Sequence, residues 1–253
     1  MTPYCPTLTG HNTSQEPLKT SLGTTVKPDI ILYPLNFQPT KVDPLSSAEI
    51  TGEVKFEKDE DPFTDSARLA IYNVRSGYYR LRTEGTWEFV IDPAKYLQNL
   101  GQMASYATAH LCSQFRTHVF SFLIFPSHAR LMKWDRAGAV FTGPIPLKDS
   151  LLAEFFWRYS YATPEQRGYD CIVKPFHGNL HLAKRFIIEQ LGPYDGDDSL
   201  GSHEVSLHEV SMPSSLKSYI VSRPSHLGIS SLPSWATRVF KAWSFWPQTR
   251  SYY

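Results

Sequence analysis

Apolar residues recur along this chain with two spacings, one typical of strands and one typical of helices. Short apolar runs bounded by turn-rich segments predict strands at 29–33 and 50–56. At 93–112 the apolar residues recur three or four apart, behind an Asp as N-cap and a Pro at the first helical position. We therefore expect a helix over 93–112, between the first strands and the centre of the chain.

The same patterns continue to the C-terminal part of the chain. Asn179 is the expected N-cap of one helix. The further strands are expected at 117–125, 129–134, 139–142, 216–222 and 237–243, and the further helices at 147–161 and 179–191.

This order of elements predicts an α/β fold with a mixed central sheet, flanking helices on both faces and an irregular C-terminal segment. Residues 1–26 are rich in Thr, Ser, Pro and Gly without periodicity, and we expect them to be a disordered arm. The α/β domain is expected at 27–191, followed by an acidic flexible loop at 192–215 and the C-terminal segment at 216–253.

Charge and composition narrow the classes of function. The 253 residues are 42% hydrophobic, and 25 Lys and Arg against 24 Asp and Glu leave a net charge of +1. Such a balance gives no strong nucleic-acid signal, because no global field attracts a polyanion. The longest apolar run, at 119–126, is far shorter than the roughly 20 residues of a membrane span, so no membrane association is expected.

The cysteines indicate the compartment. Cys5, Cys112 and Cys171 are widely spaced, with no Cys-x-x-Cys pair, and no apolar N-terminal stretch resembles a signal peptide. We expect an intracellular protein, cytoplasmic or nuclear.

Charged residues alternate along the strand expected at 50–56. Glu53 and Lys55 would lie on one face, with Val54 and Phe56 on the opposite, core face. With Asp29 on a neighbouring strand, two carboxylates could ligate a divalent cation, and the lysine could neutralise developing charge. Alternating charges on a strand are usually a solvated face, and the motif by itself does not exclude either interpretation.

Pro28-Asp29 followed by Glu53-Val54-Lys55 resembles the PD-(D/E)xK motif of the restriction-endonuclease-like superfamily. Gln102 and Tyr106 on the following helix are similar to the Gln-x-x-x-Tyr element of some of its branches. The resemblance implies a restriction-endonuclease-like fold. It also implies a nuclease-like site of Asp29, Glu53, Lys55 and Gln102, working or vestigial, in which Asp29 and Glu53 would hold Mg²⁺.

A longer resemblance covers about residues 28–242. Its blocks are, in order, 53–56 with 61–63, 100–102 with 106–107, 113–121 (Ser-Gln-Phe-Arg-Thr-His-Val-Phe-Ser), 134–140 (Trp-Asp-Arg-Ala-Gly-Ala-Val) and 155–160 (Phe-Phe-Trp-Arg-Tyr-Ser). Together these blocks resemble the fungal-type protein kinase family, of which the chain would carry the part that precedes the catalytic core. The segment 216–253 would then be the truncated start of the kinase N-lobe and a tail.

Phosphotransfer needs an Asp near the substrate hydroxyl and residues that hold magnesium, usually found in His-Arg-Asp and Asp-Phe-Gly motifs. Neither motif occurs here, nor does Ala-Pro-Glu or a Gly-rich loop. We expect a protein that is inactive as a kinase and acts as a binding or regulatory module, with no cofactor unless the nuclease-like site is intact and takes Mg²⁺. The alternative is a Mg²⁺-dependent nuclease using Asp29, Glu53 and Lys55.

The helix expected at 147–161 carries more aromatic residues than one helix face can bury. Part of this aromatic stripe is therefore a candidate interface for an unknown protein partner. Asp135 and Arg136, at the end of a strand, are expected to fix a turn through hydrogen bonds and to have no catalytic role.

Overall fold

The structure is a computed structural model. It describes residues 5–20, 24–37, 44–57, 60–63, 94–179, 181–183, 185, 208–212, 217–221, 226–227, 238–239 and 242–244. By their contacts the residues form two compact units, the first comprising 1–169 with 229–236 and the second 170–228 with 237–253. The first unit therefore ends before residue 191, where we had expected the α/β domain to end.

The first unit is built on a seven-stranded mixed sheet with the order β1-β4-β5-β6-β7-β8, in which β9 also pairs with β7. Only the β5–β6 pair within this sheet is parallel. The strands are β1 (Leu8–Asn12), β4 (Ile30–Pro34), β5 (Ile50–Val54), β6 (His118–Ile124), β7 (His128–Asp135), β8 (Ala139–Phe141) and β9 (Ile145–Pro146).

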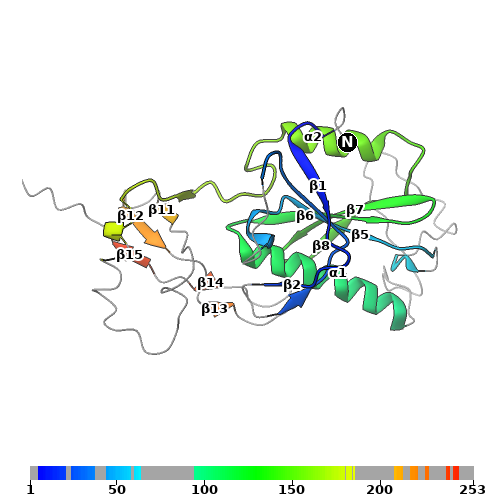
Figure 1. Ribbon diagram of the computed structural model, residues 1–253, viewed down its shortest axis with the longest axis horizontal. Helices are drawn as coiled ribbons and strands as arrows, with labels where there is room; N and C mark the ends of the chain where they lie inside the picture. Colours follow the sequence, from blue (N-terminus) through cyan, green and yellow to red (C-terminus); the bar gives the residue numbers. More distant parts are fainter. Residues whose placement is uncertain are drawn as a thin grey trace, which may run out of the picture. The chain divides into compact units, whose positions relative to one another are not determined.

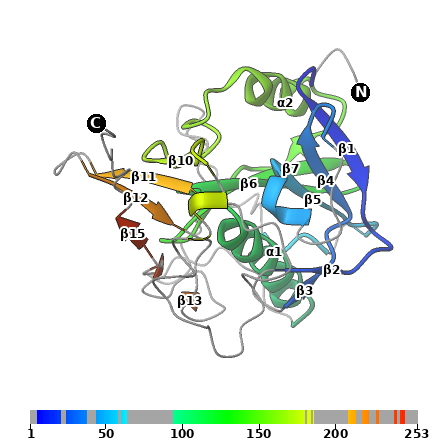
Figure 2. The ribbon, with the colours of Figure 1, turned by 60° about the vertical axis from the view of Figure 1, so that its left-hand side comes forward.

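Two helices cover opposite faces of this sheet (Figures 1 and 2). The helix α1 (Ala94–Ser113) connects the parallel strands β5 and β6, and α2 (Leu151–Tyr161) follows β9. A 3-10 turn, η1 (Pro44–Ser47), precedes β5 and contacts α1. The expected mixed sheet with a helix on each face is confirmed.

The central strand β6 explains why the sheet needs a cover on both faces. Val119 and Leu123 belong to the apolar cluster under α1, whereas Phe122 belongs to the cluster under α2. Ser121 is buried between them and accepts a hydrogen bond from Trp134 Nε1 at 2.7 Å. A strand buried on both faces reads as a nearly continuous apolar run, which is what residues 119–126 show.

Gly52 lets β5 pass close to the ring of Phe122 on β6. A Cβ atom at residue 52 would overlap the atoms of that ring. A glycine in a strand interior commonly marks such a close approach. The contact fixes the packing of β5 against β6 next to Glu53.

The expected disordered arm at 1–26 is wrong for the residues that the structure describes there. Residues 8–12 form β1, which pairs antiparallel with β4. The short strands β2 (Leu18–Lys19) and β3 (Thr25–Val26) pair with each other, and Leu18 and Val26 join the core under α1. Polar residues thus form an edge strand because β4 supplies its hydrogen bonds.

The helix expected at 147–161 begins later, at Leu151. The Leu147 N–H donates to Ser127 O and the Asp149 N–H to Pro146 O, so residues 147–149 form a turn. The strand expected at 50–56 ends at Val54, and Phe56 is 84% exposed and not part of the core as we had expected.

The second unit contains a four-stranded antiparallel sheet in the order β10-β11-β12-β15 and a separate pair of strands. Its strands are β10 (Val173–Pro175), β11 (His208–Met212), β12 (Lys217–Val221), β13 (His226–Leu227), β14 (Arg238–Val239) and β15 (Ala242–Ser244). The expected loop at 192–215 therefore contains a strand at its end, and its residues 192–207 lie outside the described residues. The strand expected at 237–243 is replaced by two shorter ones, β14 and β15.

Asn179 caps a helical segment as expected, because its Oδ1 accepts the Leu182 N–H at 3.0 Å. The remainder of the helix expected up to 191 and the tail after Ser244 lie outside the described residues.

In the part of the chain that the structure describes, no helix is long and apolar enough to cross a membrane.

Candidate functional site

Three of the predicted site residues meet at the C-terminal end of β5. Lys55 Nζ donates hydrogen bonds to Glu53 Oε1 and to Gln102 Oε1, both at 2.9 Å. The Gln102 side-chain amide also donates to Glu53 Oε1 at 2.9 Å. Glu53 and Lys55 reach α1 because they are two residues apart and so point to the same face of the sheet.

Asp29 and Tyr106 complete this cluster. The Val54 N–H donates to Asp29 Oδ2 at 2.9 Å, which fixes the carboxylate beside the end of β5. Tyr106, one helical turn after Gln102, accepts a hydrogen bond from the Gln102 amide at 2.6 Å and donates to Lys27 O at 2.6 Å. Both hydrogens of the Gln102 amide are thus engaged, so its oxygen must face Lys55.

Glu53 is the electrostatic centre of the cluster. Its carboxylate is buried, and Oε2 has no hydrogen-bond partner among the described residues. Burial raises the pKa of Glu53 above its usual value, the hydrogen bond from Lys55 opposes that rise, and the charge of Asp29 adds to it. Burial, together with the charge of Glu53, also raises the pKa of Tyr106. A second cation near Oε2 would therefore relieve an uncompensated buried oxygen.

The donor set fits a hard divalent cation. Mg²⁺ is usually held by one or two carboxylates and keeps several waters, so Asp29 and Glu53 are the candidate protein ligands. Within the described ranges, no group of three or more His, Cys, Asp and Glu side chains could hold a metal ion.

A short segment, residues 60–63, is held against α1 beside this cluster. Asn99, which lies three residues before Gln102 on α1, donates to Glu60 O at 2.9 Å. Arg130 on β7 donates through Nε to both carboxylate oxygens of Asp61, at 2.9 and 2.8 Å. His128 Nε2 lies 3.0 Å from Asp61 Oδ2. Because Arg130 is fully buried and Asp61 nearly so, this pair acts as an internal clamp on the segment.

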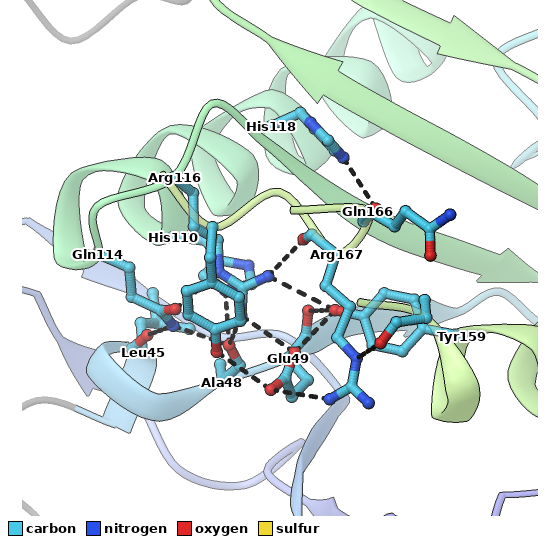
Figure 3. Close-up of polar contacts among 12 residues, drawn as sticks. Leu45, Ala48, Glu49, His110, Gln114, Arg116, His118, Tyr159, Gln166 and Arg167 are labelled. Carbon is cyan, nitrogen blue, oxygen red and sulfur yellow. Dashed lines mark hydrogen bonds and ion pairs between the residues drawn. The ribbon is translucent and has the colours of Figure 1, made fainter. Parts of the chain in front are cut away.

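A second buried cluster lies between η1, the start of β6 and α2 (Figure 3). Glu49 Oε2 accepts hydrogen bonds from Arg116 at 3.0 Å and from Tyr159 OH at 2.8 Å. Its Oε1 accepts one from Tyr169 OH at 3.0 Å and lies 3.7 Å from Arg167. Both oxygens of this carboxylate are satisfied within the protein, so Glu49 has a structural role.

Arg116 has little capacity left to bind a ligand. Its side chain also donates to Gln114 Oε1, Ala48 O and Arg167 O, at 2.7, 3.2 and 2.7 Å. Burial raises the pKa of Tyr169 to about 12, so this tyrosine stays a neutral donor. We conclude that the Glu49–Arg116 cluster fixes α2 and the η1 turn to the sheet.

Sequence reasoning missed both buried ion pairs, although Asp61, Arg116 and Tyr159 lie within the family-like blocks. Glu49 and Arg130 lie outside those blocks, and no local pattern marks them. The structural role expected for Asp135 is confirmed, because its Oδ1 accepts the N–H groups of Ala137 and Gly138. Gly138 closes this turn with a φ of 148°.

The aromatic stripe of α2 divides between core and surface. Tyr159 is buried, and Phe155 and Phe156 pack between α2 and the sheet, whereas Trp157 and Tyr161 are exposed.

Comparison of the chain with protein-family models, with curated proteins and with solved structures finds no match.

Proposed function

We propose that this chain is the N-terminal α/β module of a fungal-type protein kinase, that it does not itself transfer phosphate, and that it acts as a binding or regulatory module. The family assignment rests on the ordered blocks between residues 28 and 242. The observation that carries it is that polar residues of four blocks, Asp61, Gln102, Arg116 and Tyr159, each take part in a hydrogen-bonded cluster. In a family with a shared fold, polar residues of the ordered blocks are expected to be paired inside the protein, since an unpaired buried charge is costly.

The proposed absence of phosphotransfer is supported by the residue types in these 253 positions. Positioning of the phosphoryl group and its magnesium needs the Asp and Asn of a catalytic loop, and no such motif occurs. The test is incubation with Mg²⁺ and ATP labelled in the γ-phosphate, with general acceptor proteins present. We expect no labelled acceptor and no labelled chain. Transfer of label at a rate well above the buffer control would contradict the proposal.

A second candidate function is Mg²⁺-dependent hydrolysis of a phosphodiester at Asp29, Glu53 and Lys55, as in a restriction-endonuclease-like enzyme. The observation that favours it is Glu53, whose Oε2 is buried without a hydrogen-bond partner while Lys55 and Gln102 hold its Oε1. When bound, Mg²⁺ supplies a Lewis acid and a water of lowered pKa. The chain's own contribution would be Lys55, held by Gln102, whose positive charge would stabilise negative charge that develops on a phosphate oxygen.

This second candidate is tested by cleavage of fluorescent single-stranded and duplex nucleic acids with Mn²⁺ or Mg²⁺. This candidate predicts cleavage by the wild type and its loss in Asp29→Asn, Glu53→Gln and Lys55→Met. The matched control is Glu165→Gln, which removes an exposed carboxylate far from β5 in sequence. Cleavage that survives all three site variants would show a contaminating nuclease, and no cleavage by folded wild type would remove this candidate.

A further inference from the structure

The outward face of α2 presents large apolar side chains to solvent. Leu151, Trp157 and Tyr161 are 53%, 48% and 64% exposed, and the rings of Trp157 and Tyr161 lie 4.9 Å apart. The opposite face of α2 packs on the sheet through Phe156 and Tyr159. Because the exposed residues Leu151, Glu154, Arg158 and Tyr161 recur three or four apart and Trp157 lies beside Arg158, they form one stripe along the helix.

The charged and the apolar residues of this stripe are spaced symmetrically in the sequence about residue 156. Glu154 and Arg158 lie two residues before and after it, and Leu151 and Tyr161 lie five residues before and after it. Within one helix, Arg158 donates from Nε and from a terminal nitrogen to Glu154 Oε1, at 2.8 and 2.6 Å. Glu154 Oε2 has no such contact with a described residue, so it remains able to accept from another molecule.

We propose that this face binds the same face of a second copy of the chain, with the two α2 helices antiparallel about a two-fold axis that passes outside the helix at the level of residue 156. In that arrangement each Glu154 lies opposite Arg158 of the second copy, and each Leu151 lies opposite Tyr161 of the second copy. The two Trp157 side chains lie next to the axis. An isologous contact of this kind needs a self-complementary surface. The stripe supplies one, because it would pair Leu151 with Tyr161 and Glu154 with Arg158 on each side of the axis.

The expected dimer is reversible. An 11-residue helix is about 16 Å long, so the helix pair buries less area than a standard specific interface. Burial of the apolar side chains drives association, and the crossed ion pairs set the antiparallel direction of the two helices. Exposed charge pairs contribute more to specificity than to affinity. We expect a dissociation constant on the order of 1–100 µM. This inference is independent of the functions proposed above.

The first experiment is sedimentation velocity of the full chain over about 1–200 µM, the range that brackets such a constant. We expect a monomer–dimer equilibrium that Trp157→Ala and Tyr161→Ala each weaken at least tenfold. Val140→Ala is the matched control, because Val140 on β8 is as exposed as Trp157 and should leave the equilibrium unchanged. A monomer at every concentration would overturn the proposal, as would a dimer that neither variant weakens.

The second experiment tests the antiparallel arrangement by charge reversal. Glu154→Arg places two arginines opposite each other at both crossed positions, and Arg158→Glu places two glutamates there, so each variant alone should be monomeric. An equimolar mixture should dimerise, because every crossed pair then joins an arginine to a glutamate. Circular dichroism checks that both variants are folded. A mixture that stays monomeric under conditions where the wild type dimerises would overturn the antiparallel pairing.

Discussion

His110 on α1 should make the first unit sensitive to acid. The side chain is fully buried, and its Nε2 lies 2.8 Å from Ala48 O, so Nε2 carries the proton and donates to that carbonyl. Nδ1 is buried without a hydrogen-bond partner among the described residues. Burial, reinforced by the positive charge of Arg116, lowers the pKa of His110 from 6.5 to about 3.

The magnitude follows from the two pKa values. Between about pH 6.5 and pH 3 the unfolded chain binds a proton at His110 that the folded chain does not, so the free energy of unfolding falls as the pH is lowered. A pH of about 5 lies roughly 1.5 units below the ordinary pKa of 6.5. The free energy of unfolding is therefore lower there than at pH 7 by about 2 kcal/mol. That is a large share of the stability of an ordinary domain.

The assay is urea unfolding at about pH 7 and pH 5, with hydrogen exchange of the α1 peptide to follow this unit by itself. In His110→Gln the new amide can still donate to Ala48 O but does not titrate, so the acid loss should shrink by about 2 kcal/mol. His177→Gln, which removes an exposed histidine of the second unit, is the control and should lose as much as the wild type. An equal acid loss in wild type and His110→Gln would refute the assignment of the effect to His110.

Three further predictions concern the packing and the candidate site. Glu49→Gln leaves Arg116 as an uncompensated buried charge and should lower the free energy of unfolding by about 3–5 kcal/mol, measured in urea; a loss below about 1 kcal/mol would contradict the role of this pair. Gly52→Ala should cost about 1–3 kcal/mol by overpacking against Phe122, and adding Phe122→Leu should recover part of that cost; a double variant no more stable than Gly52→Ala would argue against this contact. Because burial raises the pKa of Glu53, protons compete for its carboxylate, so the Mn²⁺ affinity found by calorimetry should fall as the pH is lowered from neutral; a flat profile would place the metal elsewhere.

The sequence predicted those features that depend on local spacing. Alternation along β5 placed Glu53 and Lys55 on one face, and helical spacing on α1 placed Gln102 and Tyr106 one turn apart. The same rule failed at Phe56, because β5 ends at Val54 and the alternation stops with the strand. A periodic pattern shows which faces residues share but not where hydrogen bonding ends.

Features that depend on distant partners left no such signal. Strand β1 has one fully buried apolar side chain, Leu8, and exists because β4 offers it hydrogen bonds. The pair of Glu49 and Arg116 joins residues 67 positions apart, and charged residues in a sequence are expected at the surface unless a partner is known. The clamp of Asp61 by Arg130 is hidden for the same reason.

What separates the two proposed functions is whether Asp29 and Glu53 can hold a divalent cation at the end of β5, as the second candidate requires. The most direct measurement is calorimetric titration of Mn²⁺ into the wild type, into Asp29→Asn with Glu53→Gln, and into the control Glu165→Gln. The second candidate predicts binding of a single ion by the wild type and by the control, and its loss in the double variant. No binding by folded wild type, or equal binding by the double variant, would contradict that candidate and leave the binding or regulatory module.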